Sequence, residues 1–330
     1  MTTHTIPQTM TAWRQHAYGP AAVVHAETVP VPSPGKKEVL LRVAAVSLNS
    51  GDIHLMRGEP RMVRLFFGLR RPRTRGRGMD VAGTVVVLGT DVEGLAVGDL
   101  VVGAGDETLA EFVRVKAARL TPVPAGLDPV IAATLPVAGN TAATILDTCR
   151  VAKGSTVLLV GAGGGVGTLT AALAVARGAE VWATCGARAE EVLRDQGVLH
   201  TFDYRTHDIA SLPAAAFDAV VDIAGEPPLE VLRDRLRDGG TVALVGGDGH
   251  PFWGPFPRII RSLFLSRRAR RFRSVTALTK TPVTAELVRM TAAGVIRPVI
   301  EKTYPLSDAG AAIAHVDAGH TVGKVVVLPE

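Results

Sequence analysis

The chain has 330 residues, a length that favours two domains, each large enough to bury a core. Its composition, with 47% hydrophobic residues, 35 glycines and 21 prolines, is typical of an α/β enzyme rich in turns. No apolar stretch approaches the roughly 20 residues of a membrane span, no secretory leader is visible, and the two distant cysteines exclude a disulfide framework or a four-cysteine zinc site. We therefore expect a cytoplasmic protein.

The formal net charge of +5 raises the question of an anionic partner. Much of the excess lies in two arginine-rich segments, 57–77 and 258–273. Neither segment interleaves aromatic residues with arginines in the manner of a surface that binds single-stranded nucleic acid. We expect the arginines to form mainly solvated surface, with some of them serving a phosphorylated cofactor, and we expect no nucleic-acid partner.

Residues 1–125 consist of short β-rich runs separated by proline and glycine turns, a pattern that predicts a compact β-barrel-like unit. The predicted strands are 21–24, 39–46, 81–88 and 112–115.

The pattern changes after residue 125, where strands begin to alternate with helices. Apolar strands at 156–160, 180–184, 217–225 and 241–247 are linked by helices that end near Arg177, Gln196 and Leu236. Nearly continuous apolar strands joined by helices predict a parallel, doubly wound sheet over 126–279. Residues 280–330 return to a helix and a terminal strand, 324–328, for which the barrel is one candidate partner.

A glycine turn follows the first strand of this alternation and precedes an alanine-rich helix. Strand, turn and helix in this order form the context of a dinucleotide-binding fingerprint, in which glycines let the backbone approach a pyrophosphate at the helix N-terminus. The spacing departs from the usual one, since alanine stands at the first glycine position; a ligand-free turn is the alternative. The candidate cofactor residues are Ala162, Gly163, Gly164, Gly165, Val166 and Gly167.

Several segments, in order and spacing, resemble the medium-chain dehydrogenase/reductase superfamily, in its zinc-independent quinone oxidoreductase (zeta-crystallin-like) branch. The resemblance implies a GroES-like β-barrel catalytic domain, made from both chain ends, beside a Rossmann domain with a doubly wound parallel sheet. It also implies an oligomer, and we expect a homodimer. The segments are 46–52 (VSLNSGD), 78–85 (GMDVAGTV), 98–99 (GD), 136–142 (PVAGNTA), the glycine turn and 323–327 (GKVVV).

The same resemblance allows zinc to be judged residue by residue. Zinc-using relatives carry a cysteine where Ser47 stands, a His-Glu pair where Met79 and Asp80 stand, and a further cysteine near Pro136. Serine, methionine and proline do not make a zinc site. We therefore expect no metal.

The second strand of the alternation indicates which nicotinamide cofactor is bound. An NAD site usually places an acidic residue at this strand end, but here the strand runs into Cys185-Gly186-Ala187-Arg188. Arg188 is placed to bind a 2′-phosphate, and Tyr204 with Arg205 resembles the Tyr-Arg pair of the family that completes this pocket. We therefore predict NADPH; the alternative for Arg188 is a helix-surface pairing with Glu191.

The resemblance also assigns candidate catalytic residues. Asn49 matches an asparagine beside the nicotinamide, and Thr141 a threonine across the pocket. Asp52 is a further candidate, although it could instead only cap the following turn. His54 stands where many relatives carry tyrosine and could donate a proton, or could face solvent. Gly246, after the 241–247 strand, is expected near the nicotinamide.

Two segments are predicted to shape the substrate pocket. Residues 59–77 combine the cluster Leu65-Phe66-Phe67 with seven arginines and are expected to form a flap beside the barrel. Residues 251–273 mix an aromatic cluster with an arginine-studded apolar helix. Although basic amphipathic helices can bind membrane surfaces, we expect a packing and wall element and no membrane partner. The aromatic cluster suits a flat apolar substrate.

Together these features predict a metal-free, NADPH-dependent oxidoreductase that transfers hydride to a quinone or an α,β-unsaturated carbonyl compound. The cofactor supplies the reductive chemistry, and the protein supplies position and polarisation. One alternative is a biosynthetic alkene or imine reductase of the same fold. Another is a non-catalytic zeta-crystallin-like protein that binds NADPH or RNA.

Overall fold

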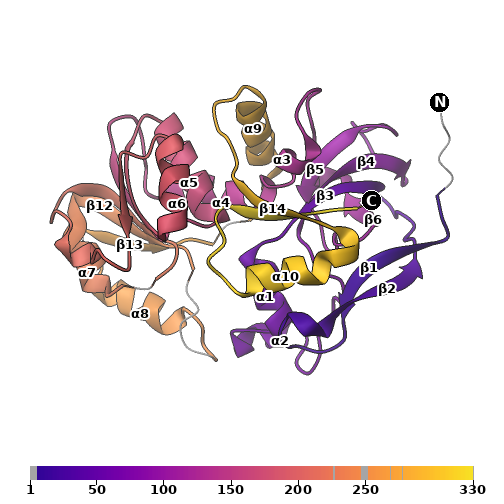
Figure 1. Cartoon of the computed structure of the whole chain (residues 1–330), viewed down its shortest axis with the longest axis horizontal. Coiled ribbons are helices and arrows are strands. Elements are labelled where there is room, and N and C mark those ends of the chain that lie inside the picture. Colours follow the sequence, from indigo (N-terminus) through magenta and orange to yellow (C-terminus); the bar gives the residue numbers. More distant parts are fainter. Residues whose placement is uncertain (1–5, 226, 247–251, 268, 277, 330) are drawn as a thin grey trace.

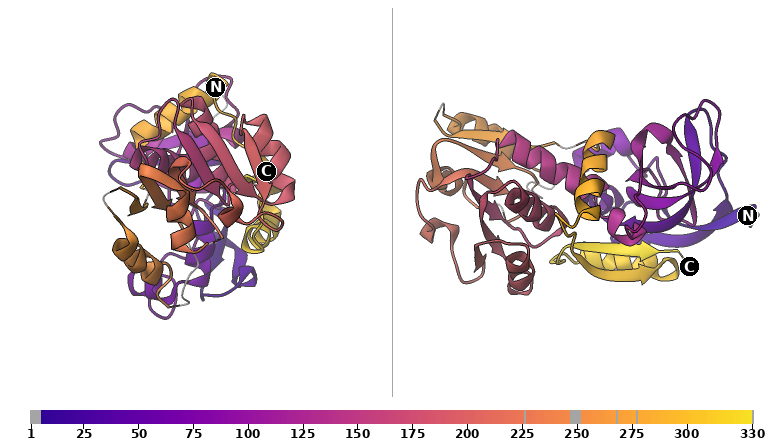
Figure 2. Two further views of the ribbon diagram at one scale, coloured as in Figure 1. Left: turned by 90° about the vertical axis from the view of Figure 1, so that its left-hand side faces the viewer. Right: turned by 90° about the horizontal axis from the view of Figure 1, so that it is seen from above.

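Two large sheets organise the chain, one built from both chain ends and one from the middle (Figure 1). The computed structural model describes residues 6–225, 227–246, 252–267, 269–276 and 278–329. The sheets lie at opposite ends of an elongated molecule, and the C-terminal segment lies beside the first sheet (Figure 2). Among the described residues, no helix is long and apolar enough to cross a membrane.

The first sheet is the predicted barrel-like unit. A two-stranded ribbon accompanies it, and its own core is formed by side chains such as Leu41, Met56 and Val81, all fully buried. The ribbon consists of β1 (Thr9–Gln15) and β2 (Val24–Pro30). The seven strands are β3 (Glu38–Ser47), β4 (Asp80–Leu88), β5 (Leu100–Ala104), β6 (Phe112–Lys116), β7 (Leu120–Pro122), β14 (Ile300–Pro305) and β15 (Lys324–Leu328).

The terminal strand joins the barrel. β15 pairs antiparallel with β3, with Val326 opposite Ser47 and Val327 opposite Val46, while β14 lies parallel on its other side. The Trp13 indole N–H donates to the Leu306 carbonyl at 2.7 Å, which ties the first strand to the returning segment. The prediction that the last strand pairs with the barrel is confirmed.

Short helices fill the barrel connections and the return. They are η1 (Ala21–Val23), α1 (Ser50–Arg57), η2 (Arg61–Val63), α2 (Arg64–Phe67), η3 (Ala117–Arg119), η5 (Leu306–Asp308) and α10 (Ala309–Asp317). The strand predicted at 21–24 was wrong: Ala21–Val23 form η1, because the Val23 N–H closes a turn onto the Pro20 carbonyl, and the strand starts only at Val24.

The second sheet is parallel throughout, in the order β10-β9-β8-β11-β12-β13. Counted from β8, this is the 3-2-1-4-5-6 order of the dinucleotide-binding fold, whose ligands lie beyond the carboxyl ends of the strands. The predicted doubly wound sheet is confirmed. Its strands are β8 (Thr156–Val160), β9 (Glu180–Cys185), β10 (His200–Asp203), β11 (Phe217–Asp222), β12 (Leu236–Leu244) and β13 (Arg271–Ser274).

Helices connect the parallel strands and bury both faces of the sheet, which is why the central strands are apolar along their length. These helices are α5 (Gly165–Ala176), α6 (Ala187–Asp195), η4 (Ile209–Ser211), α7 (Leu229–Arg235) and α8 (Phe256–Leu265). Residues 247–251, part of one predicted strand and one predicted pocket segment, lie outside the described residues.

Two boundaries in this region were predicted wrongly. The helix expected within 251–273 ends at Leu265, and Arg271–Ser274 forms the sixth strand, in which Phe272 is 2% exposed between two exposed arginines. The strand expected from residue 241 already begins at Leu236. Both strand segments were missed because neither has the continuous apolar run of a central strand. The sixth strand is rich in arginine, and the start of β12 contains charged residues and two glycines.

Helices α3 (Pro129–Ala132), α4 (Pro136–Thr148) and α9 (Thr281–Ala292) lie where the chain passes between the two sheets. Asn140 of α4 fixes the second crossing, since its Nδ2 donates to the Thr284 hydroxyl at 2.9 Å and its Oδ1 accepts the Lys280 N–H at 2.9 Å. The exact domain limits, 1–125, 126–279 and 280–330, stay a prediction.

Candidate functional site

The glycine turn joins β8 to α5 at the carboxyl edge of the parallel sheet. Gly161 has φ +77°, and its N–H donates to the Thr184 carbonyl at 3.1 Å, so the turn is pinned to β9. A Cβ on Gly167 would lie 2.4 Å from the Ala162 carbonyl oxygen, so glycine is required there for close packing of strand and helix. Val166 and Ala162 pack into the core.

Gly164 differs from its neighbours because a Cβ there would meet no atom within 4 Å. It is the N-cap of α5, with φ −80° and ψ −179°, and the unpaired N–H groups of the helix N-terminus follow it. The open space at this helix end fits an anionic pyrophosphate, which is the group that the fingerprint predicts.

The C-terminal return passes directly behind the turn. The Gly323 N–H donates to the Gly163 carbonyl at 2.8 Å, and a Cβ on Gly165 would lie 2.4 Å from the Lys324 side chain. Lys324 therefore connects the glycine turn with the barrel, because its side chain starts beside Gly165 and ends on Asn49, which precedes α1, and on Asp80, the first residue of β4.

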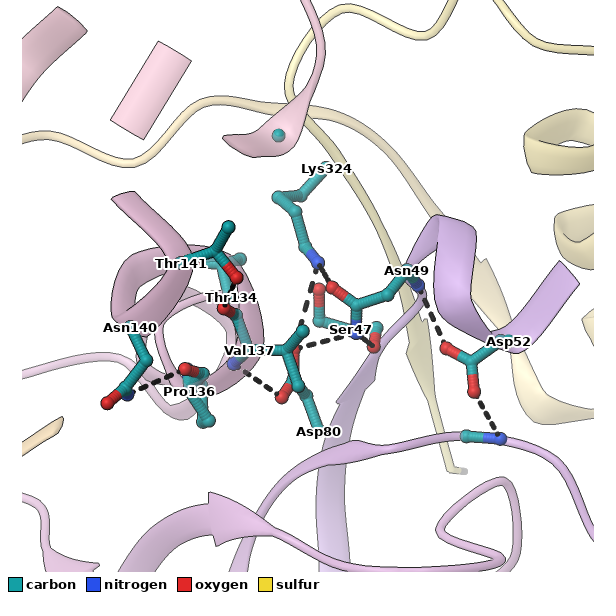
Figure 3. A network of polar contacts seen from close by, with 12 residues as sticks. Ser47, Asn49, Asp52, Asp80, Thr134, Pro136, Val137, Asn140, Thr141 and Lys324 are labelled. Atoms are coloured by element: carbon teal, nitrogen blue, oxygen red, sulfur yellow. Dashed lines mark hydrogen bonds and ion pairs between the residues drawn. The ribbon is translucent and has the colours of Figure 1, made fainter. Parts of the chain in front are cut away.

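A buried polar network surrounds the end of this lysine (Figure 3). The Lys324 ammonium donates to Asn49 Oδ1 at 2.6 Å and lies 3.7 Å from Asp80 Oδ2. Asn49 Nδ2 donates to the same Asp80 oxygen at 2.9 Å and to the Ser47 carbonyl at 3.3 Å. The other Asp80 oxygen accepts the Val137 N–H at 2.9 Å. Asn49 is thus held by bonds at both ends of its amide.

Burial dominates the electrostatics of the network. Asp80 is fully buried, which raises its pKa to about 6 against the opposing effect of Lys324. Burial also lowers the pKa of Lys324, against the effect of Asp80 and Asp52. For both partners the loss of hydration outweighs their mutual attraction, as is common for a buried ion pair. The pair is therefore held by its hydrogen bonds and by the surrounding fold.

Asp52 lies on the other side of Asn49 from Lys324 (Figure 3). Its carboxylate accepts the Asn49 N–H at 2.9 Å and the Gly78 N–H at 3.1 Å, and it is 3% exposed. Burial raises its pKa to about 6, an effect that the Asn49 N–H opposes and Asp80 adds to. Of the two roles predicted for Asp52, this geometry supports the one that fixes the start of α1, one residue after Asn49.

Of three further predicted residues, Thr141 flanks the network, His54 lies near it in sequence, and Gly246 follows β12 of the parallel sheet. Thr141 lies on the opposite side of Lys324 and Asp80 from Asn49, and its hydroxyl donates to the Val137 carbonyl at 2.8 Å (Figure 3). His54 is half-buried in α1, two residues after Asp52. Gly246 is exposed, two residues beyond the end of β12. Their roles toward a substrate stay predictions.

A cavity opens beyond the carboxyl ends of β8, β9 and β10. Its lining includes Gly161, Thr184, Tyr204 and Arg205. Tyr204 is 47% exposed, and the Arg205 guanidinium lies over its ring, 5.3 Å from the centroid. An exposed aromatic face beside an arginine fits an adenine ring with a nearby phosphate.

Arg188 is not among the residues lining this cavity. Its guanidinium donates to Glu301 Oε1 at 2.8 Å and to the His320 carbonyl at 2.5 Å, so it bridges α6 to the C-terminal return. The alternative pairing with Glu191 is not the one observed. Binding of a 2′-phosphate by Arg188 stays a prediction, and it requires the arginine to share or leave Glu301.

Sequence reasoning missed Lys324 and Asp80 as members of the site. Lys324 could have been found from its position, because it is the first residue of the apolar strand KVVVL. A lysine that begins a buried strand is expected to be buried with it and therefore to need polar partners. From the sequence, Asp80 was interpreted only as a residue that replaces a zinc ligand of zinc-using relatives, and not as a member of the site. Among the residues that the structure describes, no group of three or more His, Cys, Asp or Glu could hold a metal ion.

Comparisons with known proteins agree with this architecture. Residues 35–125 match the family model "Alcohol dehydrogenase GroES-like domain", and residues 196–327 match "Zinc-binding dehydrogenase". The "Chloroplast envelope quinone oxidoreductase homolog" of Arabidopsis thaliana is 31% identical over 330 residues, covering 96% of this chain and 97% of the relative. The chain belongs to the medium-chain dehydrogenase/reductase superfamily, in its zinc-independent quinone oxidoreductase branch.

Solved structures superpose on nearly the whole chain. The quinone oxidoreductase from Coxiella burnetii superposes with a TM-score of 0.85 at 27% identity, covering 97% of this chain and 99% of that one. The mycobacterial protein Rv1454c, solved in complex with NADPH, superposes with a TM-score of 0.82 at 26% identity, covering 97% and 100%. The predicted family and the fold class, a GroES-like domain with a Rossmann sheet, are confirmed.

Two glycines of the turn allow packing and ligand binding to be separated. We expect Gly164→Ala to leave the free energy of unfolding within about 0.5 kcal/mol of wild type, since its Cβ meets nothing, yet to weaken NADPH binding by about tenfold or more. Gly167→Ala is the matched control and loses about 1–3 kcal/mol of stability. Urea unfolding and calorimetric titration measure both. Wild-type NADPH affinity in Gly164→Ala would contradict the placement of the pyrophosphate.

The buried carboxyl groups of Asp52 and Asp80 predict that the stability of the protein depends on pH. A carboxyl group whose folded pKa is raised to about 6 stabilises the fold below its unfolded pKa, 3.8, and loses that contribution as pH rises through about 6. Between about pH 4 and pH 7, wild type is therefore expected to lose roughly 1–3 kcal/mol relative to Asp52→Asn. Urea unfolding across this range tests it. A relative gain by wild type would contradict the direction of the shift.

Proposed function

We propose that this chain is an NADPH-dependent oxidoreductase that transfers hydride to a quinone or an α,β-unsaturated carbonyl compound. The names of its relatives support the reaction type, since the "NADPH-dependent alkenal/one oxidoreductase, chloroplastic" of Arabidopsis thaliana is 29% identical and covers 98% of this chain. The observation that carries the proposal is the position of Lys324. It joins the glycine turn to Asn49 and Asp80, so the expected cofactor and substrate regions meet at one network.

The residues present fit a dinucleotide cofactor. Gly163, Gly164 and the helix N-terminus after them would hold the pyrophosphate, and Thr184 and Tyr204 would line the adenosine region. When bound, NADPH supplies the hydride.

The chain's own residues then position the substrate and stabilise charge. A quinone or enone that accepts hydride at a conjugated carbon develops negative charge on its oxygen, which donors and cations stabilise in a site shielded from water. Asn49 cannot donate freely while both its N–H groups serve Asp80 and Ser47, so we assign it a positioning role toward Lys324. Thr141 and His54 are the proposed contacts to the substrate, with His54 or water returning the proton.

The proposed preference for NADPH over NADH is supported by the end of β9. The strand ends at the buried thiol of Cys185, and Gly186 follows, so no acidic residue stands at the end of this strand, where an NAD site usually has one. Arg205 lines the cavity directly, and Arg188 lies on the adjoining helix α6. Both are proposed to bind the 2′-phosphate, Arg188 after releasing Glu301.

Other properties remain proposals, and of these only the homodimer rests on the family resemblance. We propose a homodimer, a small apolar conjugated substrate and a cytoplasmic location. Relatives of this chain carry the words chloroplastic and mitochondrial in their names, so they occupy more than one compartment.

The proposed activity is tested by following the absorbance of the reduced nicotinamide with quinones, enals and enones, with and without a chelator. We expect turnover of at least one class with NADPH, unchanged by chelation. Arg205→Ala is expected to raise the KM for NADPH by about tenfold and leave the KM for NADH unchanged, because it removes one charge-assisted phosphate contact. Arg289→Ala, on the surface of α9, is the matched control.

Turnover of no substrate class, or turnover abolished by the chelator, would contradict the proposed reaction. An unchanged KM for NADPH in both Arg205→Ala and Arg188→Ala would leave the reaction standing but remove these arginines from the cofactor site.

A further inference from the structure

A cluster of polar side chains ties α6 to the C-terminal return beside the cavity proposed for adenosine. Its centre is Glu301, the second residue of β14, whose side chain is 15% exposed. Glu301 Oε1 accepts a hydrogen bond from the Arg188 guanidinium at 2.8 Å. Glu301 Oε2 accepts the Val322 N–H at 2.9 Å and lies 3.5 Å from His315 Nε2. Both oxygens of the carboxylate are therefore engaged.

The two partners of the ion pair differ in how firmly they are held. Glu301 is fixed by the Val322 N–H and lies against His315, whose Nδ1 is 3.1 Å from the hydroxyl of the buried Tyr304. Arg188, in contrast, has a side chain that is 65% exposed on a long, flexible stem. When the pair opens, the arginine is the partner that moves.

Arg188 lies next to the cavity without lining it. A Cβ on Gly186, the N-cap of α6, would lie 3.7 Å from the ring of Tyr204, which lines the cavity. The Arg188 Nη1 donates to Glu301, and its Nη2 donates to the carbonyl of His320, another lining residue. A guanidinium binds a phosphate with two parallel N–H donors, and here both terminal nitrogens already serve acceptors of the protein.

We propose that Glu301 competes with the 2′-phosphate of the cofactor for Arg188 and thereby sets how strongly the protein prefers NADPH to NADH. The inference rests on the proposed binding of NADPH. While Arg188 is bound to Glu301 it does not line the cavity, so the carboxylate holds the arginine out of the site. NADH carries no 2′-phosphate and leaves the pair intact.

The strength of the pair suits a competition that the phosphate can win. An ion pair with a well-exposed partner changes an equilibrium constant only severalfold, because water and salt screen it. A phosphate offers more charge and more acceptor oxygens than the carboxylate. Glu301 is thus expected to lower the affinity for NADPH without abolishing it.

Calorimetric titration of the full chain with adenosine 2′,5′-bisphosphate and with adenosine 5′-monophosphate tests the competition, since the two nucleotides differ only in the 2′-phosphate. We expect Glu301→Gln to bind the bisphosphate about three- to fivefold more tightly than wild type and the monophosphate equally well. Glutamine keeps an oxygen that can accept the Val322 N–H, so the local fold is retained.

Two further variants control for other effects of the lost carboxylate. Arg188→Ala/Glu301→Gln is expected to bind the bisphosphate no more tightly than Arg188→Ala, because the gain requires the arginine. Glu286→Gln changes the net charge equally and removes a carboxylate of α9 that pairs with Arg289 at 2.5 Å. It is expected to bind both nucleotides like wild type.

Three results would overturn the proposal. They are a bisphosphate affinity of Glu301→Gln that equals or falls below that of wild type, a gain that persists without Arg188, and a gain of the same size in Glu286→Gln. If wild type prefers the bisphosphate and Glu301→Gln does not differ from it, the NADPH preference stands and the competition fails. If wild type does not distinguish the nucleotides, the NADPH preference fails, and a gain for the bisphosphate alone in Glu301→Gln still supports the competition.

Discussion

One buried cation organises the site. Lys324 stands at the head of the last strand, 4% exposed, with its stem against the glycine turn and its ammonium on Asn49 and Asp80. Burying a charge is unfavourable unless it is paired and hydrogen-bonded, so each of these partners is required once the lysine is enclosed. The network therefore fixes the relative position of the parallel sheet, the first barrel strands and the C-terminal return.

Several other features of the fold serve this junction. The return must come back to the barrel for β15 to pair with β3, and Gly323 must lie against Gly163 for the lysine to pass behind the turn. Asp52 holds the start of α1, which keeps Asn49 in place, and Val137 of α4 holds Asp80 from the other side. Contacts from four separate parts of the chain thus converge, and the expected cofactor and substrate regions are joined at one network.

The fold was largely predictable because its signals are local and repeated. Apolar strands alternating with helices gave the parallel sheet, and the glycine turn after β8 gave its ligand edge. Segments without such a pattern were missed: Phe272 is a single buried residue between arginines, and Ala21–Val23 form a turn in a valine-rich run. In the site, Asn49 was predictable from its motif, but its bonds to Asp80 and Lys324 join residues 31 and 275 positions away in the sequence. The pairing of Arg188 with Glu301 is equally non-local, spanning 113 positions.

A double-mutant cycle on Asp80→Asn and Lys324→Met tests most directly whether this network holds the two halves of the site together. Urea unfolding of wild type, both single variants and the double variant gives the coupling energy. Each single variant is expected to lose roughly 3–5 kcal/mol, because it leaves a buried group without its partner, and the double variant to lose less than the sum by more than about 1 kcal/mol. Losses that add to within about 0.5 kcal/mol would show that the two residues act independently and would contradict the account.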